Sequence, residues 1–202
     1  MSDKGYVKYS CNWEKTDPIH EGRILELNKW RDRLYALGLI GAYDNGVGFG
    51  NISVRGADSD SFLTTGTATG TLTKLDGAHY AEVIDFDIRG NTLTCKGPIQ
   101  ASSESLTHGA VYVAAPEIKA VIHVHSQKLW DALIGKVPTT SKDAEYGTPE
   151  IADEVSRLLR ETDVEDYKII VLGGHQEGIL TFGSTLDEAG RVILENYRKH
   201  IG

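Results

Sequence analysis

The chain has 202 residues, 40% of them hydrophobic, and its 21 Lys and Arg against 29 Asp and Glu give a net charge of −8. A chain of this length buries roughly 70% of its unfolded surface, so it needs neither a disulfide nor a structural metal to hold a core. The acidic balance and the lack of a basic cluster argue against binding to nucleic acid or to an anionic membrane.

The N-terminal residues and the cysteines bear on the cellular compartment. The opening stretch, MSDKGYVKYSCNWEK, has no apolar signal core, and no run in the chain approaches the ~20 apolar residues of a membrane span. Cys11 and Cys95 are far apart in the sequence and form no CxxC pair, which fits a reducing compartment better than a disulfide scaffold. We therefore expect a cytoplasmic protein.

The first predicted elements are a helix and a group of short strands. Apolar residues recur at three- and four-residue spacing over 21–39 and the pattern stops at glycines, which predicts an amphipathic helix. The stretch GAYDNGVGFG follows as a glycine-rich loop. Four strand-like runs then make the middle of the chain β-rich, and the turn RGN joins the last two as a hairpin. These runs are 51–55, 61–65, 81–88 and 92–97.

Helices and buried strands alternate in the second half. A helix is predicted from Ser103 to about Ala115, where Pro116 ends it, and the run 119–125 then returns as a buried strand. Farther along, Thr148 is predicted to cap one helix, and Thr185 with Glu188 forms a capping box that opens the last one. The elements of this part are helix 149–161, strands 167–174 and 178–182, and helix 186–200. We interpret the chain, residues 1–202, as a single α/β domain with helices at both ends.

Two histidines stand one residue apart in the apolar strand AVIHVH. Residues two apart in a strand point to the same face, and the imidazoles of His123 and His125 can each place one nitrogen ~2.1 Å from a single divalent ion. The alternative is that one ring is a core histidine bonded to backbone and the other is incidental, which is the commoner explanation of an isolated HxH. The stretch VLGGHQEG places His175 at the end of a second apolar strand, with Glu177 two residues on, and so offers a third ligand. Three histidines with an open fourth position are one way in which zinc is presented to a substrate.

A second group of polar residues is typical of an anion site. Ser102 and Ser103 stand at a predicted helix start and Glu104 follows at once, so free N–H groups, the helix dipole and two hydroxyls meet there. The alternative is an ordinary serine cap with an acidic first turn. Small polar residues at upstream strand ends, where backbone amides can approach an oxyanion, are Asn51, Thr65 and Gly66.

These motifs together resemble the class II aldolase/adducin family. They are GNISVR, TTG, SSE, PEIKAVIHVHS and a glycine-flanked histidine before GILTFGSTLDEA, in that order, and the resemblance covers about residues 22–195. It implies a three-layer α/β/α fold around a largely antiparallel sheet. It also implies a cytoplasmic homotetramer whose site lies between neighbouring subunits and holds zinc or a similar divalent ion.

The resemblance assigns roles to individual residues. It makes His123 and His125 metal ligands and Glu104 the acid/base group. The family usually has histidine directly before the glycine, a place that Glu177 holds here, with His175 two residues earlier. We favour His175 as the third ligand, with QE as a local insertion, and keep Glu177 as the alternative. The phosphate contacts that the resemblance implies are Asn51, Thr65, Gly66, Ser102 and Ser103.

One departure from the family concerns the proton donor. Its sugar-phosphate aldolases carry a longer segment after the HxH strand, with a tyrosine that protonates the departing aldehyde. Here only SQKLWDALIGKVPTTSKDAE separates His125 from YGTPEIA, and this stretch contains no tyrosine. Tyr197 and His200 are the only late candidates. The sequence thus predicts metal binding more firmly than any one reaction.

The leading hypothesis is a zinc-dependent aldehyde-lyase for a small phosphorylated ketose or related hydroxy-carbonyl compound. The ion would bind the carbonyl and adjacent hydroxyl oxygens and stabilise an enediolate, while Glu104 moves the proton. Epimerisation and dehydration on the same scaffold remain alternatives. Two other hypotheses are a non-catalytic adducin-like assembly or binding domain and a sugar-binding or regulatory protein with a metal but no proton donor.

Overall fold

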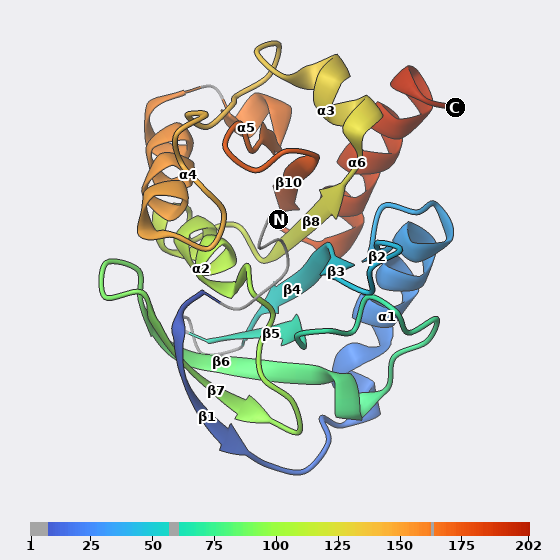
Figure 1. Cartoon of the computed structure of the whole chain (residues 1–202), viewed down its shortest axis with the longest axis vertical. Coiled ribbons are helices and arrows are strands. Elements are labelled where there is room, and N and C mark those ends of the chain that lie inside the picture. Colours follow the sequence, from blue (N-terminus) through green and yellow to red (C-terminus); the bar gives the residue numbers. More distant parts are fainter. Residues whose placement is uncertain (1–7, 57–60, 163) are drawn as a thin grey trace.

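The computed structural model describes residues 8–56, 61–162 and 164–202. Its helices (Figure 1) are α1 Glu21–Ala36, α2 Ser105–Ala114, α3 Gln127–Leu133, α4 Pro149–Glu161, α5 Val164–Tyr167 and α6 Leu186–His200, with a short 3-10 turn, η1 Gly77–His79. Its strands are β1 Ser10–Lys15, β2 Gly41–Ala42, β3 Gly48–Phe49, β4 Asn51–Arg55, β5 Phe62–Thr65, β6 Tyr80–Asp87, β7 Thr92–Gly97, β8 Ala120–His125, β9 Ile169–Val171 and β10 Gly178–Gly183. Of the helices in these described ranges, none has the length and apolar character needed to span a membrane.

Eight strands form one sheet in the order β1-β7-β6-β5-β4-β8-β10-β9. Every neighbouring pair in this sheet is antiparallel except β1 and β7, which run parallel. The prediction of a largely antiparallel sheet is therefore confirmed. The strands β2 and β3 form a separate ribbon that leads into β4.

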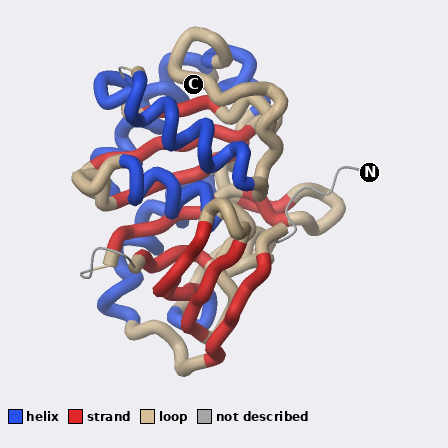
Figure 2. The backbone as a smooth tube through the Cα atoms, turned by 90° about the vertical axis from the view of Figure 1, so that its left-hand side faces the viewer, coloured by secondary structure: helices blue, strands red, loops and turns tan. Residues whose placement is uncertain are grey.

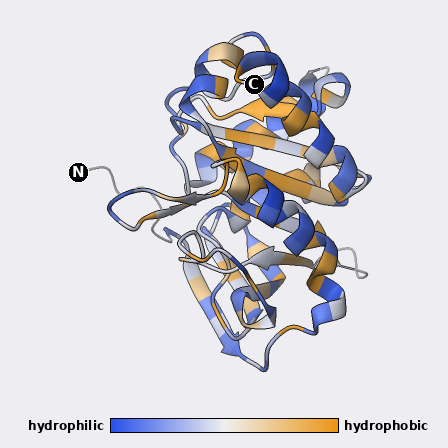
Figure 3. Ribbon diagram, turned by 90° about the vertical axis from the view of Figure 1, so that its right-hand side faces the viewer, coloured by the Kyte–Doolittle hydropathy of each residue, from blue (hydrophilic) through white to orange (hydrophobic). Residues whose placement is uncertain are grey.

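Helices cover both faces of the sheet, which makes three layers. Alternate residues of β8 point to opposite faces, so Val121 packs in one core with α2 and α4, and Ile122 packs in the other with α1 and α6. In the upper part of Figure 2 the strands run between helices, and in the upper part of Figure 3 these strands are mostly apolar. Because both faces of β8 are buried, this strand is almost entirely apolar, and its two histidines are the exceptions.

The predicted helix boundaries hold where local chemistry determines them. The last helix spans 186–200 as expected, and the Thr185 hydroxyl accepts from the Glu188 N–H at 3.1 Å. The reciprocal half of the capping box is absent, because the Glu188 carboxylate accepts from the N–H of Ser184 instead. The hydroxyl of Thr148 does not cap α4; it donates to the Glu145 carbonyl at 2.7 Å.

Several predicted elements are shorter than expected, among them the helix predicted from Ser103, which spans Ser105–Ala114. The first helix ends at Ala36 rather than 39, because Gly38 takes a φ of +70° that stops the helical path. The strand expected over 167–174 is only Ile169–Val171, since Lys168 has a φ of +51° that no strand continues through. The helix α3, which begins after Ser126 at the end of β8, was not predicted from the sequence.

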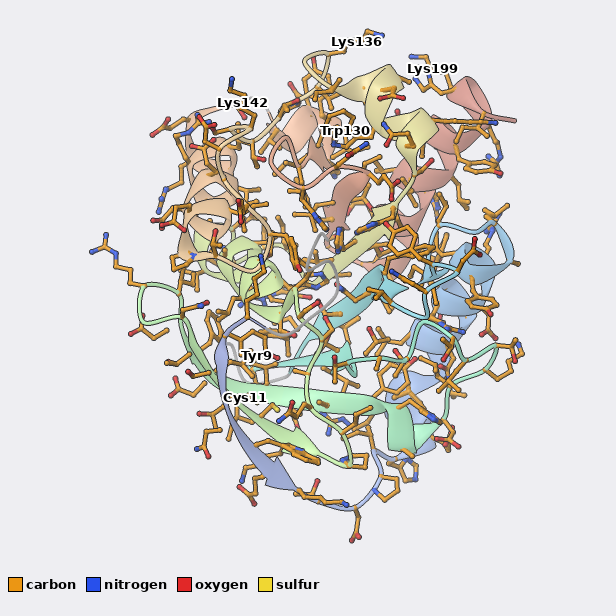
Figure 4. All side chains as sticks on the ribbon, in the orientation of Figure 1. Tyr9, Cys11, Trp130, Lys136, Lys142 and Lys199 are labelled. Carbon is orange, nitrogen blue, oxygen red and sulfur yellow. The ribbon has the colours of Figure 1, made fainter. Side chains whose placement is uncertain are left out.

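The N-terminal strand β1 joins the sheet edge and approaches the helix start of α2. Its Cys11 sulfur lies 3.6 Å from the Cys95 sulfur of β7, although both thiols are free and far apart in sequence. The Tyr9 hydroxyl donates to the Ala101 carbonyl at 2.9 Å and lies 3.2 Å from the Ser102 carbonyl. Figure 4 labels Tyr9 and Cys11 on this segment. Tyr9, just before β1, thus fixes the backbone of residues 101–102, which precede α2.

Candidate metal centre and active site

The three histidines predicted as metal ligands come together at one end of β8. His123 and His125 lie on the sheet face that packs against α2 and α4, and His175 comes from the tight turn between β9 and β10. In that turn the His175 N–H donates to the Leu172 carbonyl and the His175 carbonyl accepts from Gly178. A Cβ at Gly178 would lie 2.6 Å from the His175 ring, so glycine is required for the ring to sit there. One ligand nitrogen from each histidine lies within 4.8 Å of the other two.

The burial and protonation of this cluster fit a divalent ion. His123, His125 and His175 are 1%, 6% and 4% exposed. Burial, then the neighbouring imidazoles, hold the pKa of His123 well below its usual range, so its ring is neutral, which is the form that binds a metal. Neither ring nitrogen of His123 has a hydrogen-bond partner among the described residues. Zinc–nitrogen bonds of 2.0–2.1 Å space tetrahedral ligands about 3.4 Å apart, so small ring rotations would suffice to bind one ion.

Glu177 lies beside the histidine cluster, and its carboxylate is hydrogen-bonded to Tyr43. Its carboxylate accepts a hydrogen bond from the Tyr43 hydroxyl, and that hydroxyl lies 2.9 Å from Nδ1 of His125. The same carboxylate is 3.7 Å from Nδ1 of His125. Among the described residues, the group close enough to share an ion contains His175 and does not contain Glu177.

Glu104 stands just before α2 with its carboxyl group buried. It is 3% exposed, and its Oε2 accepts a hydrogen bond from the Thr107 hydroxyl at 2.9 Å. Burial raises the pKa of Glu104 to about 7, against smaller lowering effects of the Thr107 hydrogen bond and Lys8. Its Oε1 has no hydrogen-bond partner within the described ranges. A carboxyl group with a pKa near 7 suits acid–base work at neutral pH.

A cavity of about 520 Å³ joins the histidine cluster to Glu104 and to most of the predicted anion-binding residues. Asn51, Gly66, Ser102 and Ser103 line it, whereas Thr65 does not. The hydroxyl oxygen of Thr65 instead accepts from the backbone of β4 at 3.3 Å. The described lining contains no Lys or Arg, so an anion there would be held by neutral donors.

Two of these residues carry polar atoms suited to a ligand. Oγ of Ser102 and Oδ1 of Asn51 are buried without a hydrogen-bond partner in the part of the chain that the structure describes. Gly66 is held close to its surroundings, since a Cβ there would lie 2.4 Å from the Ile99 side chain. Its N–H donates to the His79 carbonyl at 2.8 Å and is already used. Gly66 therefore offers no free N–H donor to a ligand, and its lack of a side chain lets the backbone pack closely against Ile99.

Aromatic residues form a wall that sequence reasoning missed. Tyr43 and Phe49 come from the glycine-rich loop, and the Phe49 ring stacks on His125 with centroids 5.4 Å apart. The ring centroid of Tyr146 lies 4.8 Å from that of His175. Tyr146 opens the YGTPEIA stretch, directly after the segment that lacks a tyrosine. The glycine-rich composition of 41–50 was the available signal for a loop that closes over a site.

The two late candidates lie elsewhere in this chain. Tyr197 packs against the core on the α1 and α6 side of the sheet, away from the histidine cluster, and His200 is exposed at the end of α6. Neither lines the cavity that the described residues form.

A buried polar chain lies below the site on the same face of the sheet. His108 of α2 is fully buried, and its Nδ1 lies 2.7 Å from the Ser53 hydroxyl. The Ser53 hydroxyl is in turn 2.7 Å from the Tyr112 hydroxyl. These contacts join α2 to β4, and full burial of the imidazole keeps it neutral by lowering its pKa.

We expect this neutral histidine to make the protein less stable in acid. Burial lowers the pKa of His108 from 6.5 to about 3, so between these values the unfolded chain binds a proton that the native chain does not. The free energy of unfolding should then fall by about 1.4 kcal/mol per pH unit from this group as the pH drops below 6.5. Urea unfolding of the metal-free protein from about pH 7 to pH 5 should give a steeper decline for the wild type than for His108→Gln. Equal slopes would show that His108 is not held neutral.

The layered sheet and the buried histidine cluster beside a serine-flanked glutamate define the class II aldolase type of α/β protein. The sequence pattern of the class II aldolase and adducin N-terminal domain matches residues 35–196, and the chain belongs to this family. Membership supports an aldolase-type lyase in broad terms, and it agrees with a divalent metal at the histidine cluster.

Solved structures share the fold at low sequence identity. An L-fuculose 1-phosphate aldolase superposes with a TM-score of 0.67 at 21% identity, over 90% of this chain and 84% of its own. The L-fuculose-1-phosphate aldolase of Thermus thermophilus gives 0.58 at 23% identity, with coverages of 86% and 85%. A sugar-phosphate aldolase from Thermotoga maritima gives 0.61 at 17% identity, with coverages of 87% and 90%. No curated protein matches the chain in sequence.

Proposed function

We propose that this protein is a metal-dependent lyase that cleaves a small phosphorylated ketose or a related hydroxy-carbonyl compound. The observation that carries the proposal is a single cavity that holds three buried histidines, a buried glutamate with one unpaired oxygen, and a serine-lined helix start. Each part has a use in such a reaction: a metal ligand set, a proton carrier and an anion site. A purely structural domain has no physical reason to keep the three together.

The ligand set favours zinc at the cluster. His123, His125 and His175 would supply three imidazole nitrogens to such an ion, and His123 is held neutral by burial. A divalent ion held there supplies Lewis-acid polarisation of the substrate carbonyl. The burial of all three rings excludes bulk water from this side of the cavity, which strengthens electrostatic effects on a bound substrate.

Glu104 is the residue that we assign to proton transfer. Thr107 fixes Oε2 by a hydrogen bond, so Oε1 is the oxygen left to take a proton from the substrate hydroxyl as that carbon becomes a carbonyl and the C–C bond breaks, and then to give the proton to the carbon released by the cleavage. The raised pKa keeps both protonation states within reach near neutral pH.

The start of α2 is the proposed phosphate site. The hydroxyls of Ser102 and Ser103, just before the first turn of α2, give donors without a full positive charge, and the positive end of the helix dipole lies beside them. Asn51 adds an amide from the end of β4. A phosphate is the anion best matched to several neutral donors at a helix N-terminus.

The proposal is tested with a substrate panel. The purified protein is loaded with zinc and offered tetrulose, pentulose and hexulose phosphates, and the products of retro-aldol cleavage, epimerisation and dehydration are all assayed. Retro-aldol cleavage of one member supports the lyase; an epimer or a dehydrated product would assign the alternative reactions. Ligand binding without any turnover would replace the lyase with a binding or regulatory protein.

Assembly is part of the proposal and has its own test. The family resemblance suggests a homotetramer with each site between neighbouring subunits. Light scattering behind gel filtration measures the mass directly, and a monomer of 22.1 kDa that turns over substrate would contradict a shared site.

Ser103→Ala is expected to weaken binding of phosphorylated ligands by roughly 1.5–3 kcal/mol, because one donor to the phosphate is lost. Calorimetric titration with a phosphorylated substrate and with its unphosphorylated analogue measures the effect. The unphosphorylated analogue should bind the variant and the wild type almost equally.

The control for this variant is Ser156→Ala, which removes a buried serine hydroxyl from α4, outside the cavity lining. It should leave both affinities unchanged. If Ser103→Ala weakens both ligands alike, the Ser103 hydroxyl does not contact a phosphate, and a neutral or carboxylate-bearing substrate replaces the phosphorylated one. The ordinary serine cap considered from the sequence is not formed, since the residue before α2 is Glu104 and no side chain caps the helix.

A further inference from the structure

The glycine-rich loop between β2 and β3 fixes a phenol against one of the proposed metal ligands. Within the loop the Tyr43 N–H donates to the Val47 carbonyl at 2.9 Å, and Gly46 turns the chain with a φ of +81°. The Tyr43 and Phe49 rings pack with centroids 4.7 Å apart, and Phe49 stacks on His125. The loop thus packs the phenol against Phe49 and beside His125.

The hydrogen bonds around this phenol determine which nitrogen of His125 carries the proton. The Tyr43 hydroxyl has one hydrogen, and it donates that hydrogen to Oε2 of Glu177, because an ionised carboxylate can only accept. At its other contact, 2.9 Å from Nδ1 of His125, the phenol oxygen must therefore accept. Nδ1 is the protonated nitrogen, and the lone pair of the ring lies on Nε2.

We propose that Tyr43 and Glu177 are positioning residues that hold His125 in the Nδ1–H tautomer, with Nε2 directed to the metal. This inference rests on the metal site of the proposed function. Groups that bind the far nitrogen of a ligating histidine orient its ring and raise its basicity, here through a carboxylate that acts across a phenol. Glu177, the alternative third ligand, then supports the site from one step further out.

The backbone at Glu177 agrees with a role beyond packing. Its φ of +72° places a non-glycine residue in the left-handed region, at the end of the turn that presents His175. Such a conformation is unfavourable for a residue with a Cβ, and residues that adopt it cluster at active sites and ligand clamps. The carboxylate is also partly buried, with 23% of its side chain exposed, and it faces the phenol rather than open solvent.

Metal affinity gives the first test. Tyr43→Phe removes one oxygen and keeps the ring that packs on Phe49, and Glu177→Gln keeps the shape of the side chain but removes its charge. Both variants should bind zinc about 10–100-fold more weakly in competition with a chromogenic chelator. Tyr35→Phe, on α1 at the other side of the sheet, is the matched control and should bind like the wild type.

The tautomer gives a second test that needs no metal. In nitrogen-15 spectra of the metal-free protein at about pH 8, His125 should carry its proton on Nδ1, and Tyr43→Phe should show a mixture of both tautomers. A merely structural role for Tyr43 would leave this spectrum unchanged. Thermal unfolding checks that each variant is folded, and Glu177→Gln carries the test if Tyr43→Phe is not.

The outcomes separate this inference from the proposed function. If the wild type binds zinc and both variants bind it equally well, or if His125 carries its proton on Nε2, the positioning role is overturned and the metal site stands. If the wild type binds no zinc, the metal site itself fails, and the positioning role is lost with it.

Discussion

His123→Ala and His125→Ala are each expected to abolish zinc binding, from about one ion per chain in the wild type. Two imidazoles are too few to hold the ion in a buried site. The strand β8 is hydrogen-bonded to β4 on one side and to β10 on the other, so it cannot shift to supply another ligand. Elemental analysis after dialysis against a fixed concentration of free zinc measures the loss.

Zinc occupancy in three other variants shows whether the loss is specific to the ligand cluster. His175→Ala should remove the ion equally, whereas Glu177→Ala should only weaken its binding, because Glu177 contacts Tyr43 and lies outside the ligand cluster. His200→Ala, at the exposed end of α6, is the control and should keep full occupancy. Full occupancy in both β8 variants would refute the metal centre.

Glu104→Gln is expected to reduce turnover by ~10²–10⁴-fold while substrate binding changes little. Glutamine has the same shape and its amide oxygen can still accept the Thr107 hydrogen bond, but it cannot carry a proton. Steady-state kinetics with the substrate found in the panel should show the loss in kcat rather than in KM.

The pH profile separates loss of the base from a change in structure. Burial raises the pKa of Glu104 to about 7, and a bound cation would lower it, so activity in the wild type should rise with pH up to a limit at or below about 7. Glu104→Gln should lack this limb, and Glu195→Gln, exposed on α6, should retain it. A Glu104→Gln enzyme with wild-type turnover would remove Glu104 from the reaction.

Local patterns in the sequence were sufficient to predict the last helix and to place His123 and His125 on the same face of a strand. A capping threonine and an amphipathic repeat predict the helix 186–200, and both signals act between residues a few positions apart. The HxH pair lies on one face because the side-chain period of a strand is two. Glu104 beside a helix start is likewise a local arrangement. Such features are predictable because the interacting groups are neighbours in the chain.

Packing between distant segments decided the rest. His175 rather than Glu177 joins the cluster because the turn before β10 folds back on β8, and Gly178 leaves room for the ring. Tyr43 reaches both Glu177 and His125 only because the β2–β3 loop closes over the end of the sheet. No local periodicity encodes these contacts, since they depend on which strands are neighbours in the sheet.

The N-terminal strand shows the same division. Cys11 and Cys95 are remote in sequence, yet the parallel pairing of β1 with β7 brings their sulfurs to 3.6 Å. The amino-acid sequence by itself determined the elements with strong local signals, the residue types of the candidate metal site and the family. Only the tertiary structure decided the third histidine, the aromatic wall and the phenol–carboxylate pair, because these depend on side chains that meet across the sheet order rather than along the chain.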